Sequence, residues 1–365
     1  MTVAEETYLV IGGGGFVGRR IVEMLLDGHS PEAADTTVSS FPDRPIPKVH
    51  VFDRRITFAD PRVASFIEGD ITSLASLLPA CNGITTVIHT AALIENVSRD
   101  LLYNVNVEGT KRVVEACVES GVRKLVYTSS ASVTYNGQDL RNGDEMDPYC
   151  DVHMDAYNET KAEAERFVRE ANGKGGLITV VLRPAGIFGP ADNNASKGLY
   201  EAAKKGNWKF MIGDNSYLFD WTYVDNVAHA HILAANVMDK RKGVAGEVFY
   251  ITNHTPTFFW DVPKYLYNHL GYTNTLSKRI PRTLGFILGS TVDFFVSLIH
   301  ATTGKVVTPT FTRFRVQIIT SNRYWDTEKA VKVLGYKPVV ELEEGLRRTA
   351  AYWKGVMENE KVASE

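Results

Sequence analysis

Hydrophobic and polar positions follow two recurring patterns in the first half of the chain. Short, continuously apolar runs are typical of strands buried on both faces. Between them lie stretches in which apolar residues recur every three or four positions, as on one face of a helix. The apolar runs are YLVIG, KVHVFD, SFIEGD, TTVIHTAA, RKLVYTSS and LITVVLRP. This alternation predicts an α/β protein with a parallel sheet and helices on both of its faces.

The expected architecture is a Rossmann-type doubly wound sheet with a smaller C-terminal substrate-binding lobe. Helices are predicted for FVGRRIVEMLLDG and near Ser73 to Pro79, Val105 to Ser120 and Tyr157 to Ala171. We assign residues 1–182 to the nucleotide-binding domain, with 220–252 returning to it, and residues 183–219 and 253–365 to the lobe. His29 to Lys48 contains four prolines and is expected to be an inserted surface loop.

Composition narrows the function classes. The 365 residues are 44% hydrophobic and 23% charged, and the net charge of -3 gives no reason to expect a nucleic-acid partner. Cys81, Cys117 and Cys150 are odd in number and irregularly spaced, which fits neither a disulfide framework nor a zinc site and implies a reducing compartment. We expect no metal site. The acidic N-terminus leads directly into the first strand and does not resemble a signal peptide.

Three glycines stand between the first strand and the first helix. Gly12, Gly15 and Gly18 form the pattern G-x-x-G-x-x-G, which lets the backbone approach a pyrophosphate and presents helix N-terminal amides to it. A tight strand-to-helix turn needs the same residues. The strand before and the amphipathic helix after favour a dinucleotide site.

Acidic residues at two strand ends suggest which dinucleotide binds. Asp53 ends the second strand, where a carboxylate can accept hydrogen bonds from ribose hydroxyls and repel a 2'-phosphate, so NAD is favoured. Arg54 and Arg55 follow and would suit the phosphate of NADP, which keeps that alternative open. Asp70 is either an adenine contact or only a helix cap.

Tyr157 and Lys161 are the predicted catalytic pair. Their i, i+4 spacing places both side chains on one face of a helix, where the ammonium would favour the phenolate form of the tyrosine. Upstream, LVYTSSAS places hydroxyls at the carboxyl edge of the sheet, where doubly wound folds bind ligands. Ser130 is our choice for the hydroxyl that orients the substrate oxygen, and Ser129 is its rival.

These motifs are similar to those of the extended short-chain dehydrogenase family. Within it, the chain closely resembles the 3β-hydroxysteroid dehydrogenase branch whose sterol-4α-carboxylate dehydrogenases serve sterol C-4 demethylation. The resemblance runs from Tyr8 to about Tyr352. It rests on the blocks VIGGGGFVG, VFD, NVEGTKRVVEAC, LVYTSSASV, MDAYNETKAEAE, LRPAGIFGP, IGDNSYLFDWTYVDNV and FYITNHTPTFFW.

The resemblance implies NAD-dependent oxidation of the 3β-hydroxyl of a 4α-carboxysterol to the ketone, with loss of the carboxylate as CO2. It assigns Tyr157 as acid/base, Lys161 as the ribose-binding cation, Ser130 as substrate ligand and Asn106 as a structural and proton-relay residue. The expected cofactor contacts are Gly12, Gly15, Phe16, Val17, Gly18, Asp53, Arg54, Asp70, Ile71, Thr90, Ala91, Ala92, Tyr157, Lys161, Pro184 and Ile187.

Two segments depart from the pattern common in the branch. The chain has Ala91-Ala92-Leu93 instead of alanine-serine-proline, and Ala191-Asp192-Asn193-Asn194 instead of glycine-aspartate-arginine-glutamine. Both segments should border the substrate. A relative that oxidises a sterol-like or triterpenoid secondary metabolite would show the same motifs.

Residues 280–300 are the most apolar stretch, and within them 282–300 should form a helix. Apolar residues recur at helical spacing and Asp293 interrupts the run, which favours a helix lying in a membrane interface. Lys278, Arg279 and Arg282 at its start suit lipid headgroups. A core helix of the lobe and a dimer contact are the alternatives. Peripheral attachment to the cytosolic face of the endoplasmic reticulum is expected, with a soluble cytoplasmic protein as the alternative.

Three further readings stay open. A homodimer and contacts with other enzymes of sterol C-4 demethylation would agree with the resemblance. A sugar-nucleotide epimerase or dehydratase uses the same tyrosine-lysine pair, but the chain shows no evident basic cluster for a diphosphate. A catalytically idle scaffold of a sterol-processing complex is disfavoured by the intact pair.

Overall fold

A seven-stranded, fully parallel sheet forms the centre of the molecule. The computed structural model describes residues 6–28, 46–94, 97–304 and 311–364, so most of the predicted inserted loop, His29 to Lys48, lies outside the described residues. Along the sheet the strands run β12 (Val248–Ile251), β7 (Ile178–Pro184), β5 (Lys124–Thr128), β4 (Thr86–His89), β1 (Thr7–Ile11), β2 (Lys48–Asp53) and β3 (Ser65–Glu68). The predicted doubly wound architecture is confirmed.

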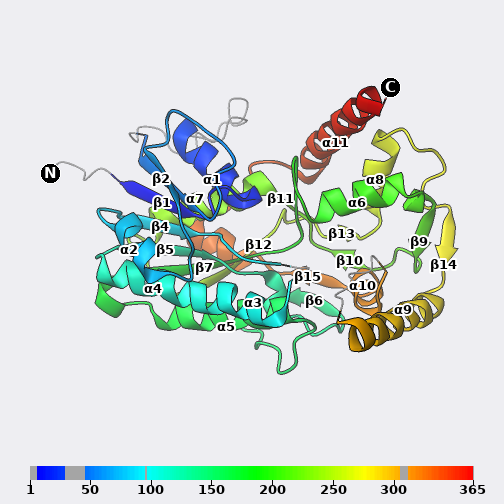
Figure 1. The fold of residues 1–365 in the computed structure, drawn as a ribbon, viewed down its shortest axis with the longest axis horizontal. Coiled ribbons are helices and arrows are strands. Elements are labelled where there is room, and N and C mark those ends of the chain that lie inside the picture. Colours follow the sequence, from blue (N-terminus) through cyan, green and yellow to red (C-terminus); the bar gives the residue numbers. More distant parts are fainter. Residues whose placement is uncertain (1–5, 29–45, 95–96, 305–310, 365) are drawn as a thin grey trace.

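Helices cover both faces of this sheet (Figure 1). One face carries α1 (Phe16–Asp27) and α7 (Val224–Val237), which pack against each other, and the other carries α2 (Leu74–Cys81), α4 (Thr110–Glu119) and α5 (Ala156–Glu170). The predicted helix Val105 to Ser120 is part of a longer run, in which α3 (Arg99–Tyr103) and a π-helical turn, Asn104–Gly109, precede α4.

The order of strands changes direction after β1, because β2 lies on one side of it and β4 on the other. In open parallel sheets, ligands bind at such a switch point, outside the carboxyl ends of the strands. The glycine turn directly follows β1. The topology therefore places the predicted dinucleotide site at this edge.

The remaining elements form a smaller lobe beyond the carboxyl edge of the sheet (Figure 1). Its helices are α6 (Ala195–Lys204), α8 (Asp261–His269), α9 (Arg282–Thr303), α10 (Arg313–Ile319) and α11 (Leu342–Ser364). Its largest sheet joins β13 (Thr257–Phe258), β10 (Leu218–Phe219), β15 (Arg323–Trp325) and β6 (Leu140–Gly143). Two-stranded sheets pair β8 (Ile187–Phe188) with β11 (Thr222–Tyr223), and β9 (Phe210–Ile212) with β14 (Lys278–Ile280).

Candidate active site

The glycine turn is a tight passage between β1 and α1. A Cβ at Gly12 would lie 2.6 Å from the backbone nitrogen of Ala91, and one at Gly18 would lie 2.1 Å from the carbonyl oxygen of Gly12. Gly12 also has a positive φ of 84°. Any side chain at these positions would collide with backbone. Gly15, extended at the N-cap of α1, leaves the amides of the first helical turn facing outward.

A cavity of about 620 Å³ opens at this turn and runs to the end of β5 and the loop after β7. Its walls include every predicted cofactor contact except Lys161. They also include Ser130. Those shared residues are Gly12, Gly15, Phe16, Val17, Gly18, Asp53, Arg54, Asp70, Ile71, Thr90, Ala91, Ala92, Tyr157, Pro184 and Ile187. The two departing segments also border it, through Leu93, Asp192, Asn193 and Asn194. Its shape and glycine floor fit a dinucleotide.

Asp53 and Asp70 bound one end of this cavity. Asp53 Oδ2 accepts the backbone N–H of Gly14 at 2.9 Å, which ties the strand end to the glycine turn. Asp70 Oδ1 accepts the N–H and the hydroxyl of Thr72, both at 2.8 Å. Asp70 therefore stabilises the turn before α2 and also faces the cavity, so the two interpretations of this residue are compatible.

Tyr157 lies at the other end of the cavity, in the first turn of α5. Asp155 caps this helix by accepting the N–H of Asn158 at 2.7 Å. Burial raises the pKa of Tyr157 to about 12, and a hydrogen bond with Ser130 opposes that rise. Without further positive charge the phenol therefore stays protonated at neutral pH.

Lys161 is 2% exposed and follows Tyr157 by one turn of α5. Its ammonium donates to the carbonyl of Thr128 and lies 4.3 Å from the centre of the Tyr127 ring. Burial lowers the pKa of Lys161 to about 7, and the negative charge of Glu165 opposes this. The end of β5 thus supplies the immediate partners of the buried cation.

Sequence reasoning missed the residues that surround this cation. Thr128 donates its hydroxyl to His231 Nε2 at 2.7 Å, since His231 Nδ1 is bonded to the Val227 carbonyl at 2.7 Å. Burial lowers the pKa of His231 to about 4, which keeps the ring neutral. No pattern along the chain connected His231 with β5.

The hydroxyls after β5 have separate roles. Ser129 and Ser130 both line the cavity. The Ser129 hydroxyl donates to the buried carboxylate of Glu165, which also accepts from Arg183, whereas Ser130 bonds to Ser132 Oγ at 2.7 Å. Ser132 in turn donates to Asn158 Oδ1 at 2.6 Å. Ser129 is committed to the interior, which favours Ser130 as the substrate ligand.

Asn106 lies in the π-helical turn and is 1% exposed. Its amide makes two hydrogen bonds to the backbone of Leu93, at 2.8 and 2.9 Å, and one to Thr160 at 3.1 Å. The geometry corresponds to the structural role implied for Asn106. Its role as a proton relay stays a prediction.

Comparisons with known proteins agree with this geometry. Residues 9–282 match the model of the 3-beta hydroxysteroid dehydrogenase/isomerase family. The chain is 41% identical over 354 residues to the decarboxylating sterol-4-alpha-carboxylate 3-dehydrogenase of Candida albicans, covering 96% of this chain and 98% of the relative. It is 38% identical to the human enzyme of that name over 343 residues, covering 93% and 86%.

Solved structures show the same fold at lower identity. The dTDP-glucose 4,6-dehydratase DesIV of Streptomyces venezuelae, solved with NAD, superposes with a TM-score of 0.71 at 22% identity, covering 96% of this chain and 97% of its own. The UDP-glucose 4-epimerase of Thermotoga maritima gives a TM-score of 0.69 at 21% identity, covering 96% and 99%.

Proposed function

Because the chain belongs to the 3-beta hydroxysteroid dehydrogenase/isomerase family, we propose that it oxidises the 3β-hydroxyl of a 4α-carboxysterol to the 3-ketone with NAD, and that the carboxylate leaves as CO2. The observation that carries this is the near full-length similarity to sterol-4-alpha-carboxylate 3-dehydrogenases, together with Tyr157 and Ser130 at one end of the cavity. The protein is therefore an oxidoreductase of sterol C-4 demethylation.

NAD fits the described cavity. The cradle at Gly12 and Gly18 has no room for side chains, and the N-terminus of α1 would hold the pyrophosphate of the cofactor. The carboxylate of Asp53, which accepts the N–H of Gly14 through Oδ2, would also accept hydrogen bonds from the adenosine ribose. When bound, NAD supplies the hydride acceptor and a positive ring near the phenol. Use of NADP, for which Arg54 and Arg55 would be suited, stays an alternative prediction.

The chain's own residues handle the proton and the oxygen. Tyr157 takes the proton of the 3β-hydroxyl as the hydride departs from C3. Lys161 holds positive charge beneath the phenol, and Ser130 bonds to the substrate oxygen. In the resulting β-keto acid, the bond from C4 to the carboxylate breaks and its electron pair enters an enolate. Ser130 and Tyr157 can bond to the enolate oxygen, and a proton then reaches C4.

An assay of NADH formation tests this proposal. A 4α-carboxysterol, a simple 3β-hydroxysterol and a UDP-sugar are offered in parallel, and CO2 release is measured with the first. We expect turnover with the carboxysterol, and Tyr157→Phe should lower kcat by roughly 100-fold or more while NAD binding persists. Turnover of the UDP-sugar alone would support an epimerase, and binding without turnover would support the scaffold.

We also propose that α9 attaches the protein to a membrane surface. By length and composition α9 is long enough to cross a membrane, and little of it is buried. Gly285 and Gly289 are buried, and a Cβ at Gly289 would lie 2.6 Å from the backbone of Arg313, so this face packs on the protein. Ile287 and Phe294 on the outer side are 63% and 64% exposed. A helix with one packed and one bare apolar face is typical of an interfacial anchor.

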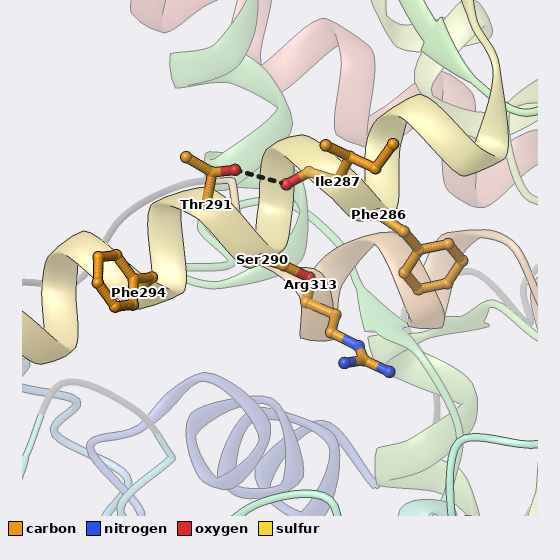
Figure 2. Close-up of a pocket in the computed structure, with 6 residues that line it drawn as sticks. All are labelled: Phe286, Ile287, Ser290, Thr291, Phe294 and Arg313. Carbon is orange, nitrogen blue, oxygen red and sulfur yellow. Dashed lines mark hydrogen bonds between the residues drawn. The ribbon is translucent and has the colours of Figure 1, made fainter.

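The lipid-facing surface is grooved. Between α9 and α10 lies an open hollow of about 580 Å³ lined by Phe286, Ile287, Ser290, Thr291, Phe294 and Arg313 (Figure 2). Arg313, Lys278 and Arg279 are exposed beside the helix, which suits acidic headgroups. We propose the cytosolic face of the endoplasmic reticulum as the location. A homodimer and contacts with other sterol C-4 demethylation enzymes stay predictions.

A further inference from the structure

Ser132 connects the segment that carries Ser130 with the helical turn that carries Tyr157. Its hydroxyl lies 2.7 Å from Ser130 Oγ and donates to Asn158 Oδ1 at 2.6 Å. Asn158 directly follows Tyr157 in the first turn of α5. We call this contact of Ser132 with Asn158 the hydroxyl–amide bridge. Ser130 and Tyr157 line the cavity, whereas the two bridge residues are not among the described residues that do.

The chain after β5 fixes one end of the bridge. Residues Ala131–Thr134 form a short helical turn, and Ser130 at its N-cap accepts the N–H of Ser132 at 3.3 Å. Val133 and Thr134 of this turn are buried in the protein. The backbone that carries Ser132 therefore has little freedom to move, and its hydroxyl is kept next to that of Ser130.

The first turn of α5 fixes the other end. The N–H of Asn158 donates to the N-cap residue Asp155 at 2.7 Å. Asn158 is 4% exposed. A buried amide that bonds to a hydroxyl holds both groups in place, because separation would leave each of them without a partner and away from water.

The hydrogen bonds of the bridge follow one direction. An amide oxygen can only accept, so Ser132 gives its single proton to Asn158, and the proton between the two serines belongs to Ser130. The Ser130 oxygen also shares a hydrogen bond with the phenol of Tyr157. When a substrate oxygen enters, the Ser130 proton can turn to it while the N–H of Ser132 still holds the Ser130 oxygen.

Two other contacts join the end of β5 to α5, and both precede Ser130 in the chain. The ammonium of Lys161 bonds to the Thr128 carbonyl. Ser129 donates to Glu165, further along the helix. These contacts restrain the chain before Ser130, whereas the hydroxyl–amide bridge restrains it after Ser130 and ends in the turn of the catalytic tyrosine.

We propose that Ser132 and Asn158 are positioning residues that hold the hydroxyl of Ser130 beside the phenol of Tyr157. The inference rests on the proposed function, because that reaction needs both hydroxyls on one substrate oxygen. A serine side chain has three staggered χ1 positions, and the bridge selects the one in the structure. A misplacement of about 1 Å is enough to slow a reaction by about 100-fold.

The test compares Ser132→Ala, Asn158→Ala and the double variant. The rate of NADH formation is measured in a single turnover at saturating NAD and 4α-carboxysterol. Each single substitution breaks the bridge and should lower this rate by roughly 10- to 100-fold. The double variant should lose no more than about threefold beyond either single variant, whereas independent effects would multiply. Ser132→Thr keeps the hydroxyl and should retain most of the rate.

Thr275→Ala is the matched control, because Thr275 donates to Asn268 Oδ1 at 2.7 Å on the exposed surface of the lobe. This variant should react at the native rate. NAD affinity and the thermal melting temperature should stay near the native values in all variants, which separates positioning from a loss of folding. Native rates in both single variants, or losses that multiply in the double variant, would overturn the positioning role while the proposed function stands.

Crystal structures of the native protein and of Ser132→Ala give a readout that needs no substrate. In Ser132→Ala, the Ser130 hydroxyl should leave hydrogen-bond distance of the Tyr157 phenol. An unchanged Ser130 would contradict the inference. A native protein that oxidises no carboxysterol would overturn the proposed function, and the crystal structures would still decide the positioning role.

Discussion

Lys161 is a charged group in a place where burial opposes its charge. Its ammonium has one backbone acceptor and one aromatic ring as neighbours, and Glu165 lies one helical turn further along α5. The folded protein without cofactor therefore carries an energetic penalty at this residue. Such penalties are typical of functional sites, where stability is given up for a group that acts during the reaction.

The stability of the cofactor-free protein should depend on pH through Lys161. Its pKa is about 7 when folded and near 10.5 when unfolded, so between these values the unfolded state binds more protons and stability rises with pH. Lys161→Met removes this dependence. The variant should be more stable than the native protein by a few kcal/mol at pH 7, with the difference shrinking by about 1 kcal/mol per pH unit toward pH 10.

Urea unfolding of both proteins from pH 6 to pH 10 measures this difference in stability. The contributions of all other titrating groups cancel in the difference, because the two proteins share those groups. Lys161→Met should also lack activity. Two parallel stability curves would show that the folded and unfolded pKa of Lys161 are the same.

At the scale of elements, α9 is unlike the other helices. Two glycines allow it to approach α10 closely, and Asp293 accepts the backbone N–H of Arg313 at 3.0 Å. This polar and small-residue face fixes the helix on the lobe. The opposite face exposes Leu284, Ile287, Leu288, Phe294, Phe295, Leu298 and Ile299. A soluble surface rarely shows so many large apolar side chains together.

Flotation with lipid vesicles tests the membrane role of α9. We expect the native protein to float with phosphatidylcholine vesicles that contain phosphatidylserine, and less with phosphatidylcholine alone. The double variant Ile287→Asn and Phe294→Asn should stay mostly in the unbound fraction. The matched control, Val362→Asn, changes an apolar residue of α11 that is 73% exposed and should float like the native protein. A native protein that never floats would refute the proposal.

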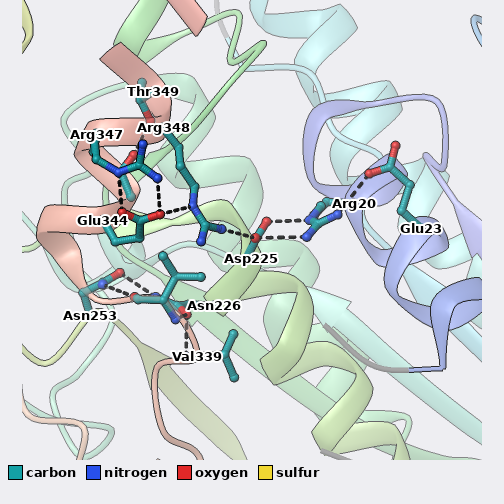
Figure 3. Close-up of polar contacts among 12 residues, drawn as sticks. Arg20, Glu23, Asp225, Asn226, Asn253, Val339, Glu344, Arg347, Arg348 and Thr349 are labelled. Atoms are coloured by element: carbon teal, nitrogen blue, oxygen red, sulfur yellow. Dashed lines mark hydrogen bonds and ion pairs between the residues drawn. The ribbon is translucent and has the colours of Figure 1, made fainter. Parts of the chain in front are cut away.

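At the scale of the whole molecule, one polar cluster connects three helices far apart in sequence (Figure 3). Asp225 of α7 is 2% exposed and lies between Arg20 of α1 and Arg348 of α11, at 2.5 and 3.8 Å. Glu344 holds Arg348 in place at 2.7 Å. The cluster joins the helix of the glycine turn to the C-terminal helix of the lobe.

Asp225→Asn should destabilise the protein by roughly 3 kcal/mol, because two arginines lose their buried counter-charge. Chemical unfolding with urea gives the free energy. Arg62→Gln is the control, since that side chain is 49% exposed and its solvent-screened ion pairs with Asp27 and Asp60 should contribute little to the free energy of unfolding. If both variants lose equally little free energy of unfolding, the polar cluster does not stabilise the attachment of the lobe.

The parts of the site that the sequence predicted are those set by local spacing. The glycine turn is local, and Tyr157 and Lys161 share a face because of helical periodicity. The surroundings of Lys161 were not predictable, since Thr128 and His231 meet only through the packing of β5 against α7. Burial, the largest cause of the pKa shift of both Tyr157 and Lys161, is likewise set by distant segments and was not visible along the chain.

The return of β12 to the edge of the sheet has a consequence during synthesis. The core on one sheet face combines β1 and α1 with Ala228 and Ala235 of α7 and with Phe249 and Ile251 of β12. The same core also includes Leu334 and Tyr336, so a nascent chain on the ribosome cannot complete it until residue 336 has emerged from the exit tunnel. Until then the apolar side chains of Val10, Ile88 and Val126 on that face are incompletely covered, and transiently exposed apolar surface of this kind makes a folding intermediate prone to aggregation.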